Sequence, residues 1–212
     1  TGAFDADWLI ARKGQPVDKS EWLMTPQTVN AYYMPPANEI VFPAAILQPP
    51  YFNPDADDAA NYGNIGMIIG HEIGHGFDDQ GSRYDGDGKL ESWWTEEDYA
   101  KFKERTAALV EQYNAYVLDP KFHVNGELTL GENIGDLAGM SIALKAYRLA
   151  LKKQGIESLD DAPVIDGMTG IQRFFFSNAR GWCTKSRPQH AEVMISVDPH
   201  SPDEFRVNGV VR

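Results

Sequence analysis

The run His71-Glu72-Ile73-Gly74-His75 places two histidines and a glutamate at a spacing that suits metal chemistry. On a helix, residues four apart lie about 40° apart around the axis, so both imidazoles can reach one cation. Catalytic zinc takes three protein ligands and leaves a fourth position for water, from which Glu72 could remove a proton as general base. The alternative is a helix with two surface histidines. The apolar residues and glycines around the run favour a zinc site, and the glycines suggest that something packs close to the helix backbone.

The third zinc ligand has to come from another segment, because the positions after His75 offer no further histidine at the required spacing. Glu132, in the run Gly131–Asp136, is the best candidate. It opens a long helical pattern and would complete a set of two histidines and one carboxylate for one Zn²⁺ per chain. Asp136 follows one helical turn later, where it could accept the free N–H of a ligating imidazole, with His71 the expected partner. Taken alone, Glu132 could instead be an acidic residue that favours a first helical turn.

Several sequence blocks occur together over most of the chain. They are Asn30-Ala31-Tyr32-Tyr33, Phe42 to Pro50 (FPAAILQPP), the HEIGH run, the GENIGD run and Asp198-Pro199-His200-Ser201-Pro202. In this order they resemble the catalytic region of the neprilysin and endothelin-converting enzyme family of zinc metallopeptidases. The resemblance implies a zincin-like, thermolysin-type fold and an endopeptidase that cuts peptides or small polypeptides on the amino side of hydrophobic residues. The absence of the cysteines of the animal enzymes suggests a microbial, bacterial member.

The resemblance also gives roles to residues that the sequence alone leaves open. His200 would donate a hydrogen bond to the oxyanion of the tetrahedral intermediate, with Asp198 orienting its ring. Arg206 would hold a carbonyl of the substrate backbone, and Asn30 and Ala31 would bind an extended peptide along an edge strand. The pocket for the residue after the cut bond would be lined by Ile46, Tyr51, Met67, Ile68 and Trp182. Without the resemblance, these positions would be interpreted as a loop histidine, a surface arginine and ordinary core.

The elements that must position these residues are mainly helical. Apolar periodicity predicts helices over residues 61–77, 95–118, 130–154 and 171–184. Short β-rich runs predict strands at residues 28–34, 39–42 and 205–211. The acidic, polar stretch 155–167 is expected to be a flexible connection. Helices with a minor sheet make α+β the expected fold class.

Composition excludes several classes of function. The net charge is −12, and binding to nucleic acid requires a basic face, so no nucleic acid partner is expected. The single cysteine excludes an internal disulfide. No apolar run has the length needed to span a bilayer, and the N-terminal residues lack the order of charged and apolar residues found in a signal peptide.

By resemblance, residues 1–212 form one catalytic domain, a fragment that lacks the helical N-terminal lobe and the extreme C-terminus of the family. The expected partners are a peptide substrate and that missing lobe of the parent protein. The compartment stays open; the resemblance is compatible with a secreted, periplasmic or membrane-anchored parent. One alternative is a catalytically weak peptide-binding fragment that keeps the zincin fold, which zinc content and cleavage of a quenched peptide would separate from an active enzyme. The other alternative is a different metallohydrolase on the same scaffold, and Asn30, Ala31 and His200 argue against it.

Overall fold

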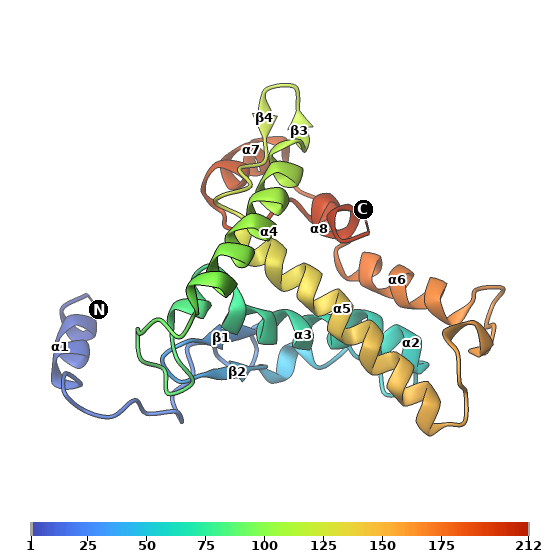
Figure 1. The fold of residues 1–212 in the computed structure, drawn as a ribbon, viewed down its shortest axis with the longest axis horizontal. Coiled ribbons are helices and arrows are strands. Elements are labelled where there is room, and N and C mark those ends of the chain that lie inside the picture. The colour runs from blue at the N-terminus through green and yellow to red at the C-terminus, as the bar shows by residue number, and fades with distance from the viewer. Residues whose placement is uncertain (1, 212) are drawn as a thin grey trace.

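The computed structural model describes residues 2–211, in which helices surround one long helix and two small antiparallel sheets lie at the edges (Figure 1). The helices are α1 (Gly2–Ala11), α2 (Asp58–Asn61), α3 (Met67–Gly74), α4 (Glu96–Asn114), α5 (Leu130–Lys153), α6 (Gly170–Gly181), α7 (Pro188–Val197) and α8 (Asp203–Gly209). The strands are β1 (Tyr32–Met34), β2 (Glu39–Val41), β3 (Val117–Asp119) and β4 (Phe122–His123). This is the α+β class that the sequence predicts. None of the helices described is both long enough and apolar enough to cross a lipid bilayer.

The segment that carries the histidine motif is one continuous helical rod from Asp58 to Phe77, although its turns are not uniform. Asp57 caps its start by accepting the backbone N–H of Ala59, which would otherwise lack a partner. A wider π turn at Tyr62–Gly66 precedes α3, and a tighter 3-10 turn at His75–Phe77 ends the rod. The predicted helix is therefore confirmed, with a start three residues before the predicted one.

Helix α3 packs against α5 at a distance that only glycine allows. A Cβ atom on Gly70 would lie 2.8 Å from the Cα of Gly139, and a Cβ on Gly139 would lie 2.4 Å from the backbone oxygen of Met67. Both distances are too short for real carbon contacts, so any larger residue would push the two helices apart. The close approach that the glycines suggested is confirmed, and it joins the motif helix to α5 as one unit.

Three apolar clusters hold the remaining elements in place. The largest lies between α2, α3, α5 and α6 and contains Ala59, Met67, Met140, Ala143, Tyr147, Leu151, Ala162 and Phe174. The second lies beside the β3–β4 hairpin and contains Tyr113, Tyr116, Val124 and Ile195. The third, made of Ala31, Ile46 and Ile65, packs the segment before β1 against the motif rod. The apolar clusters therefore hold the elements around the glycine contact, and the largest of them also packs α3 against α5.

The β1–β2 hairpin confirms the two predicted N-terminal strands, with Tyr32 opposite Val41. The third predicted strand, 205–211, is wrong, because residues 205–209 lie in helix α8 and a turn follows. Asp203 and Glu204 occupy the first turn of α8, where negative charge suits the helix dipole, and the Phe205 ring stacks on Tyr116 at a centroid distance of 4.7 Å. Contacts of α8 with α4 and α5 therefore outweigh the alternation of apolar and polar side chains that predicted a strand.

The other helical predictions are confirmed with shifted ends, since α4 stops at Asn114 and the hairpin β3–β4 follows where helix was expected to continue to residue 118. Helices α1 and α7 were not predicted. The connection 155–167 is not without structure, because it contains a 3-10 turn at Leu159–Asp161.

Candidate metal centre and cleft

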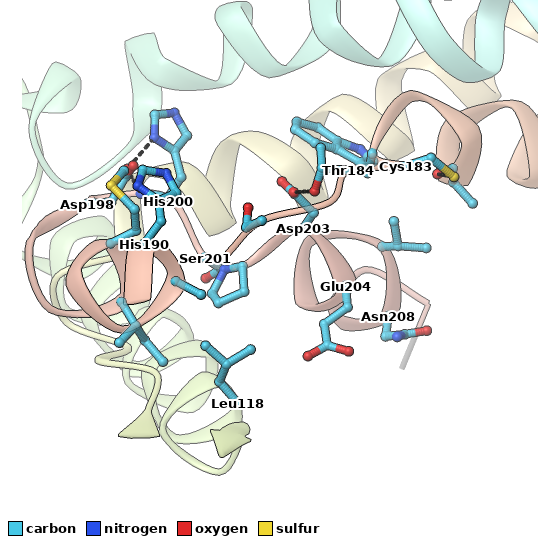
Figure 2. A pocket seen from close by; sticks show the side chains of 18 residues that line it. Leu118, Cys183, Thr184, His190, Asp198, His200, Ser201, Asp203, Glu204 and Asn208 are labelled. Atoms are coloured by element: carbon cyan, nitrogen blue, oxygen red, sulfur yellow. Dashed lines mark hydrogen bonds and ion pairs between the residues drawn. The ribbon is translucent and has the colours of Figure 1, made fainter. Parts of the chain in front are cut away.

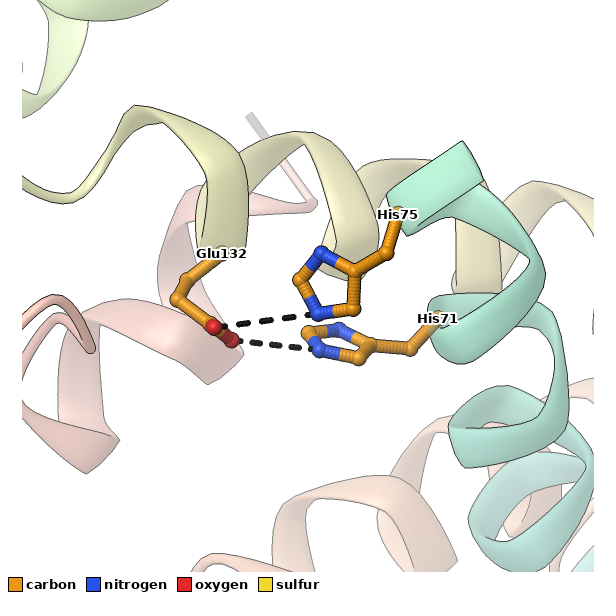
Figure 3. A group of neighbouring side chains, drawn as sticks. All are labelled: His71, His75 and Glu132. Carbon is orange, nitrogen blue, oxygen red and sulfur yellow. Dashed lines mark ion pairs between the residues drawn. The ribbon is translucent and has the colours of Figure 1, made fainter. Parts of the chain in front are cut away.

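The ring nitrogens of His71 and His75 and the carboxylate of Glu132 converge on one point (Figure 3). Nε2 of His71 lies 3.1 Å from Oε2 of Glu132, and Nε2 of His75 lies 3.7 Å from Oε1. The candidate ligand atoms all lie within 4.8 Å of one another. Zinc bonds to histidine nitrogen and carboxylate oxygen are about 2.0–2.2 Å long, so one ion between these atoms fits the spacing.

Each histidine is oriented by a carboxylate on its other nitrogen. Asp136 lies in α5 one turn after Glu132, and its Oδ1 is 2.9 Å from Nδ1 of His71. Oδ2 of Asp78 is 2.7 Å from Nδ1 of His75. A carboxylate on Nδ1 holds the proton there and leaves Nε2 free to bind a metal. The sequence reasoning assigned no role to Asp78, although its position three residues after His75 on a helical turn was the signal that could have found it.

The charges at this point suit a divalent cation. Oε2 of Glu132 is buried and makes no hydrogen bond of good geometry within the described part of the chain, although His71 lies close to it. Burial alone would lower the pKa of His71, but the carboxylates of Asp136 and Glu132 raise it to about 9. Burial would likewise raise the pKa of Glu132, yet His200 and His71 hold it far below its ordinary value. The residues present therefore fit a zinc ion by donor type, spacing and charge.

Glu72 lies between the two histidines in sequence and borders the same cleft. Its side chain is buried, and its Oε2 has no hydrogen-bond partner among the described residues. Burial raises the pKa of Glu72 above its ordinary value, while the neighbouring histidines oppose the shift. A carboxylate with a raised pKa and a free oxygen can take up a proton from a molecule held at the metal centre.

The loop after α7 brings His200 to the metal centre. Oδ1 of Asp198 accepts a hydrogen bond from the backbone N–H of His200, at 2.8 Å. The same oxygen lies 2.7 Å from Nδ1 of the His200 ring. Nε2 of His200 then lies 3.1 Å from Oε2 of Glu132. Asp198 itself faces a second cavity behind the loop, not the cleft (Figure 2). The structure thus places Nε2 of His200 beside Glu132, one of the candidate metal ligands, and His200 lines the cleft.

Arg206 lies on α8 and is almost fully buried. Its Nε and Nη2 bind the two oxygens of Asp136 at 2.7 and 2.6 Å, a paired geometry that fixes the plane of the guanidinium group. The guanidinium carbon lies 4.0 Å from the centre of the Trp182 ring, and Nη2 is 3.6 Å from Oε2 of Glu132. Arg206 therefore belongs to the buried charge network of the metal centre and also borders the cleft.

A cleft of about 680 Å³ opens in front of these residues. Its lining includes the predicted residues Asn30, Ala31, Ile46, Tyr51, Met67, Ile68, Trp182 and Arg206 together with His71, Glu72, His75, Glu132 and His200. Asp136 and Asp198 lie behind this lining. Ile46 and Met67 line the cleft and also belong to the buried apolar clusters. Met24, Val29 and Leu128 also line the cleft, and sequence reasoning did not identify them.

Comparisons with known proteins extend this picture. A family model described as Peptidase family M13 matches residues 30–212. Endothelin-converting enzyme 1 of Bos taurus is 46% identical over 194 residues, which cover 92% of this chain and 25% of the relative. Neprilysin-11 of Caenorhabditis elegans is 46% identical over 210 residues, covering 96% of this chain and 24% of the relative. The chain therefore spans about a quarter of the length of these curated relatives.

The fold matches solved structures as well. The zinc metalloprotease Zmp1 of Mycobacterium tuberculosis, solved in complex with an inhibitor, superposes with a TM-score of 0.91 at 60% sequence identity. The match covers 98% of this chain and 32% of that chain.

Proposed function

The chain belongs to peptidase family M13, and from this premise we propose that it forms the zinc-binding and catalytic part of an endopeptidase that hydrolyses peptides or small polypeptides. The observation that carries the proposal is the convergence of His71, His75 and Glu132 beside a buried Glu72 in a peptide-sized cleft. His71, His75 and Glu132 would hold one zinc ion. The chemistry that zinc supplies when bound is polarisation of the scissile carbonyl and acidification of a water molecule.

The chain's own residues would carry out the proton transfers and orient the substrate. Glu72 would take the proton from the attacking water and deliver it to the leaving amine, and its raised pKa favours this exchange. His200 would donate a hydrogen bond from Nε2 to the substrate oxygen as that oxygen gains negative charge, with Asp198 holding Nδ1. Asp136 and Asp78 would keep the ligand histidines in the required orientation.

Peptide binding would use both walls of the cleft. Asn30 and Ala31 directly precede strand β1 and border the cleft, so an extended peptide can pair with this edge. Arg206 uses Nε and Nη2 on Asp136, so we assign Nη1 to a carbonyl of the substrate backbone. The apolar wall would take the hydrophobic side chain after the cut bond; it consists of Ile46, Tyr51, Met67, Ile68 and Trp182. This wall is the basis for cleavage on the amino side of hydrophobic residues.

The organisation of the whole protein is part of the same proposal. The described chain would act as a single catalytic domain, with a peptide as its substrate and a further lobe of the parent protein closing the cleft. Matches that span about a quarter of each curated relative support this arrangement. Catalysis depends strongly on alignment, so the isolated domain would cleave more slowly than a form whose cleft is closed.

The test is zinc content and peptide cleavage measured on the same preparation. We expect about one zinc per chain by elemental analysis, and cleavage of quenched peptides before hydrophobic residues. Glu72→Gln keeps the size of the side chain and should retain the zinc while kcat falls by about 10²–10⁴-fold. Glu111→Gln, on the exposed face of α4, is the matched control and should leave both unchanged. Loss of zinc from Glu72→Gln would mean that Glu72 is a ligand and not the base; stoichiometric zinc without cleavage would favour a peptide-binding fragment.

A further inference from the structure

The loop that carries His200, Asp198–Pro202, lies between two cavities. The cleft is on one side, and a second cavity of about 650 Å³ is on the other, where Figure 2 shows Asp198 and His200 near one end and Glu204 and Asn208 of α8 near the other. His200 borders both cavities, and its side chain remains about half exposed, at 47%. Packing alone therefore holds the ring only weakly, and the position of the loop depends on its hydrogen bonds.

A chain of buried hydrogen bonds connects this loop to the start of α5. The hydroxyl of Ser201 donates to Oδ1 of Asn133 at 2.8 Å. Nδ2 of Asn133 donates to the hydroxyl of Thr129 at 2.9 Å, and that hydroxyl donates to the backbone oxygen of Asn125 at 3.0 Å. Ser201, Asn133 and Thr129 are each no more than 3% exposed. The backbone oxygen of Asn125 can only accept, so the Thr129 hydroxyl donates to it and accepts from Nδ2 of Asn133, which turns Oδ1 of Asn133 toward Ser201.

Two members of this relay, Ser201 and Asn133, adjoin the residues that meet at the candidate metal centre. Ser201 directly follows His200, and Asn133 directly follows Glu132. The Ser201–Asn133 hydrogen bond therefore joins the direct neighbours of His200 and Glu132, whose Nε2 and Oε2 atoms lie 3.1 Å apart. We propose that Asn133 and Ser201 are positioning residues, which hold His200 at a fixed place relative to the metal ligand Glu132. This inference rests on the proposed function, since His200 acts on a substrate only in a peptidase.

The kinetic test removes one hydroxyl. Ser201→Ala in the zinc-loaded protein should keep its zinc and KM and lower kcat by about tenfold, because small displacements of a catalytic group cost rate. In a double-mutant cycle, Ser201→Ala should have almost no further effect on kcat once His200→Ala is present, since a positioning residue acts only through its target. Equal effects of Ser201→Ala in both backgrounds would overturn the proposal.

Ser177→Ala is the matched control for a purely structural loss. The Ser177 hydroxyl also donates a 2.8 Å hydrogen bond between two elements, from α6 to the backbone oxygen of Ala60 in α2, but it lies outside the cleft lining. Both variants should lose thermal stability, and only Ser201→Ala should lose kcat. A comparable loss of kcat in Ser177→Ala would show that the effect is general loosening, and would overturn the assignment.

A second readout does not require activity. The chain has five histidines, so NMR spectra of protein labelled with ¹⁵N-histidine can follow each ring separately. With zinc bound, Ser201→Ala should shift and broaden the His200 signals and leave those of His71 and His75 in place. If Ser201→Ala does not fold, Thr129→Val breaks the relay one bond further on and should give a smaller shift of the same signals. An unmoved His200 ring would overturn the positioning role, whereas an inactive wild-type protein with a shifted His200 ring would contradict the proposed function alone.

Discussion

The two halves of helix α5 bury opposite kinds of side chain along one continuous face. In the first half, the inward positions are Glu132, Asn133 and Asp136; in the second half, they are Met140, Ala143, Tyr147 and Leu151. The spacing of three and four residues continues from one half to the other, so the geometry is the same throughout. In the polar half, Glu132 lines the cleft at the candidate metal centre, while the apolar half meets α2 and α6. Periodicity therefore identifies the buried face, and the chemistry of its residues separates function from stability.

The difference has an energetic meaning. Apolar burial in the second half stabilises the fold, since fully burying a large aliphatic or aromatic side chain contributes about 1.5–3 kcal/mol. The first half buries Asp136 and Arg206 as a charge pair, and such pairs contribute little net stability because desolvation offsets their attraction. Mutations in the first half should therefore change metal binding, and those that leave Arg206 without its carboxylate should also lower the free energy of unfolding. Mutations in the second half should change the free energy of unfolding alone.

The largest effect is expected for Glu132→Ala. It removes the only carboxylate among the three candidate ligands, so the protein should lose stoichiometric zinc and with it all measurable cleavage. Elemental analysis after dialysis measures the zinc content, and a circular dichroism melt of the same sample measures the stability of the fold. Retention of a full equivalent of zinc by the folded variant would break the assignment of the first half to metal binding.

Asp136→Asn should come next, and it sharpens the comparison because it preserves the shape of the side chain. The charge facing Nδ1 of His71 and the guanidinium of Arg206 disappears. Zinc affinity should fall by about 10–100-fold through the loss of the histidine's partner, and unfolding free energy should fall by about 3–5 kcal/mol because Arg206 stays buried without its carboxylate. Competition with a chelator and chemical denaturation measure the two quantities. A variant with unchanged zinc affinity would show that the His71–Asp136 contact does not tune the metal.

The smallest effect is expected for Leu151→Ala, in the apolar half near the end of the helix. Leu151 is 3% exposed, and its removal leaves a cavity that costs about 2–3 kcal/mol, toward the lower end of such substitutions because the nearby end of α5 can relax. Zinc affinity and kcat of the folded protein should not change. A drop in zinc affinity for this variant, at a temperature where it remains folded, would show that the two halves are coupled and that the division is wrong.

The sequence could predict residues whose chemistry depends on local spacing. The HEIGH run, the first-turn position of Glu132 and the long helix of α5 follow from patterns that a few neighbouring residues determine. It could not predict α8 as a helix, because the alternation from Phe205 onward resembles a strand until contacts with Tyr116 and Asp136 are known. The relay from Ser201 to Asn133 joins residues 68 positions apart, so no local pattern reveals it. Asp78 is the exception, since its spacing from His75 was available and no role was drawn from it.

The contact between Gly70 and Gly139 also determines how this protein responds to inherited change. A glycine can mutate only to something larger, and both partners already lack a Cβ atom, so neither can shrink to make room for the other. Every substitution at these two positions therefore acts as a wedge between α3, which carries His71, and α5, which carries Glu132. Random drift at this contact therefore has one direction, toward a wider separation of the two helices.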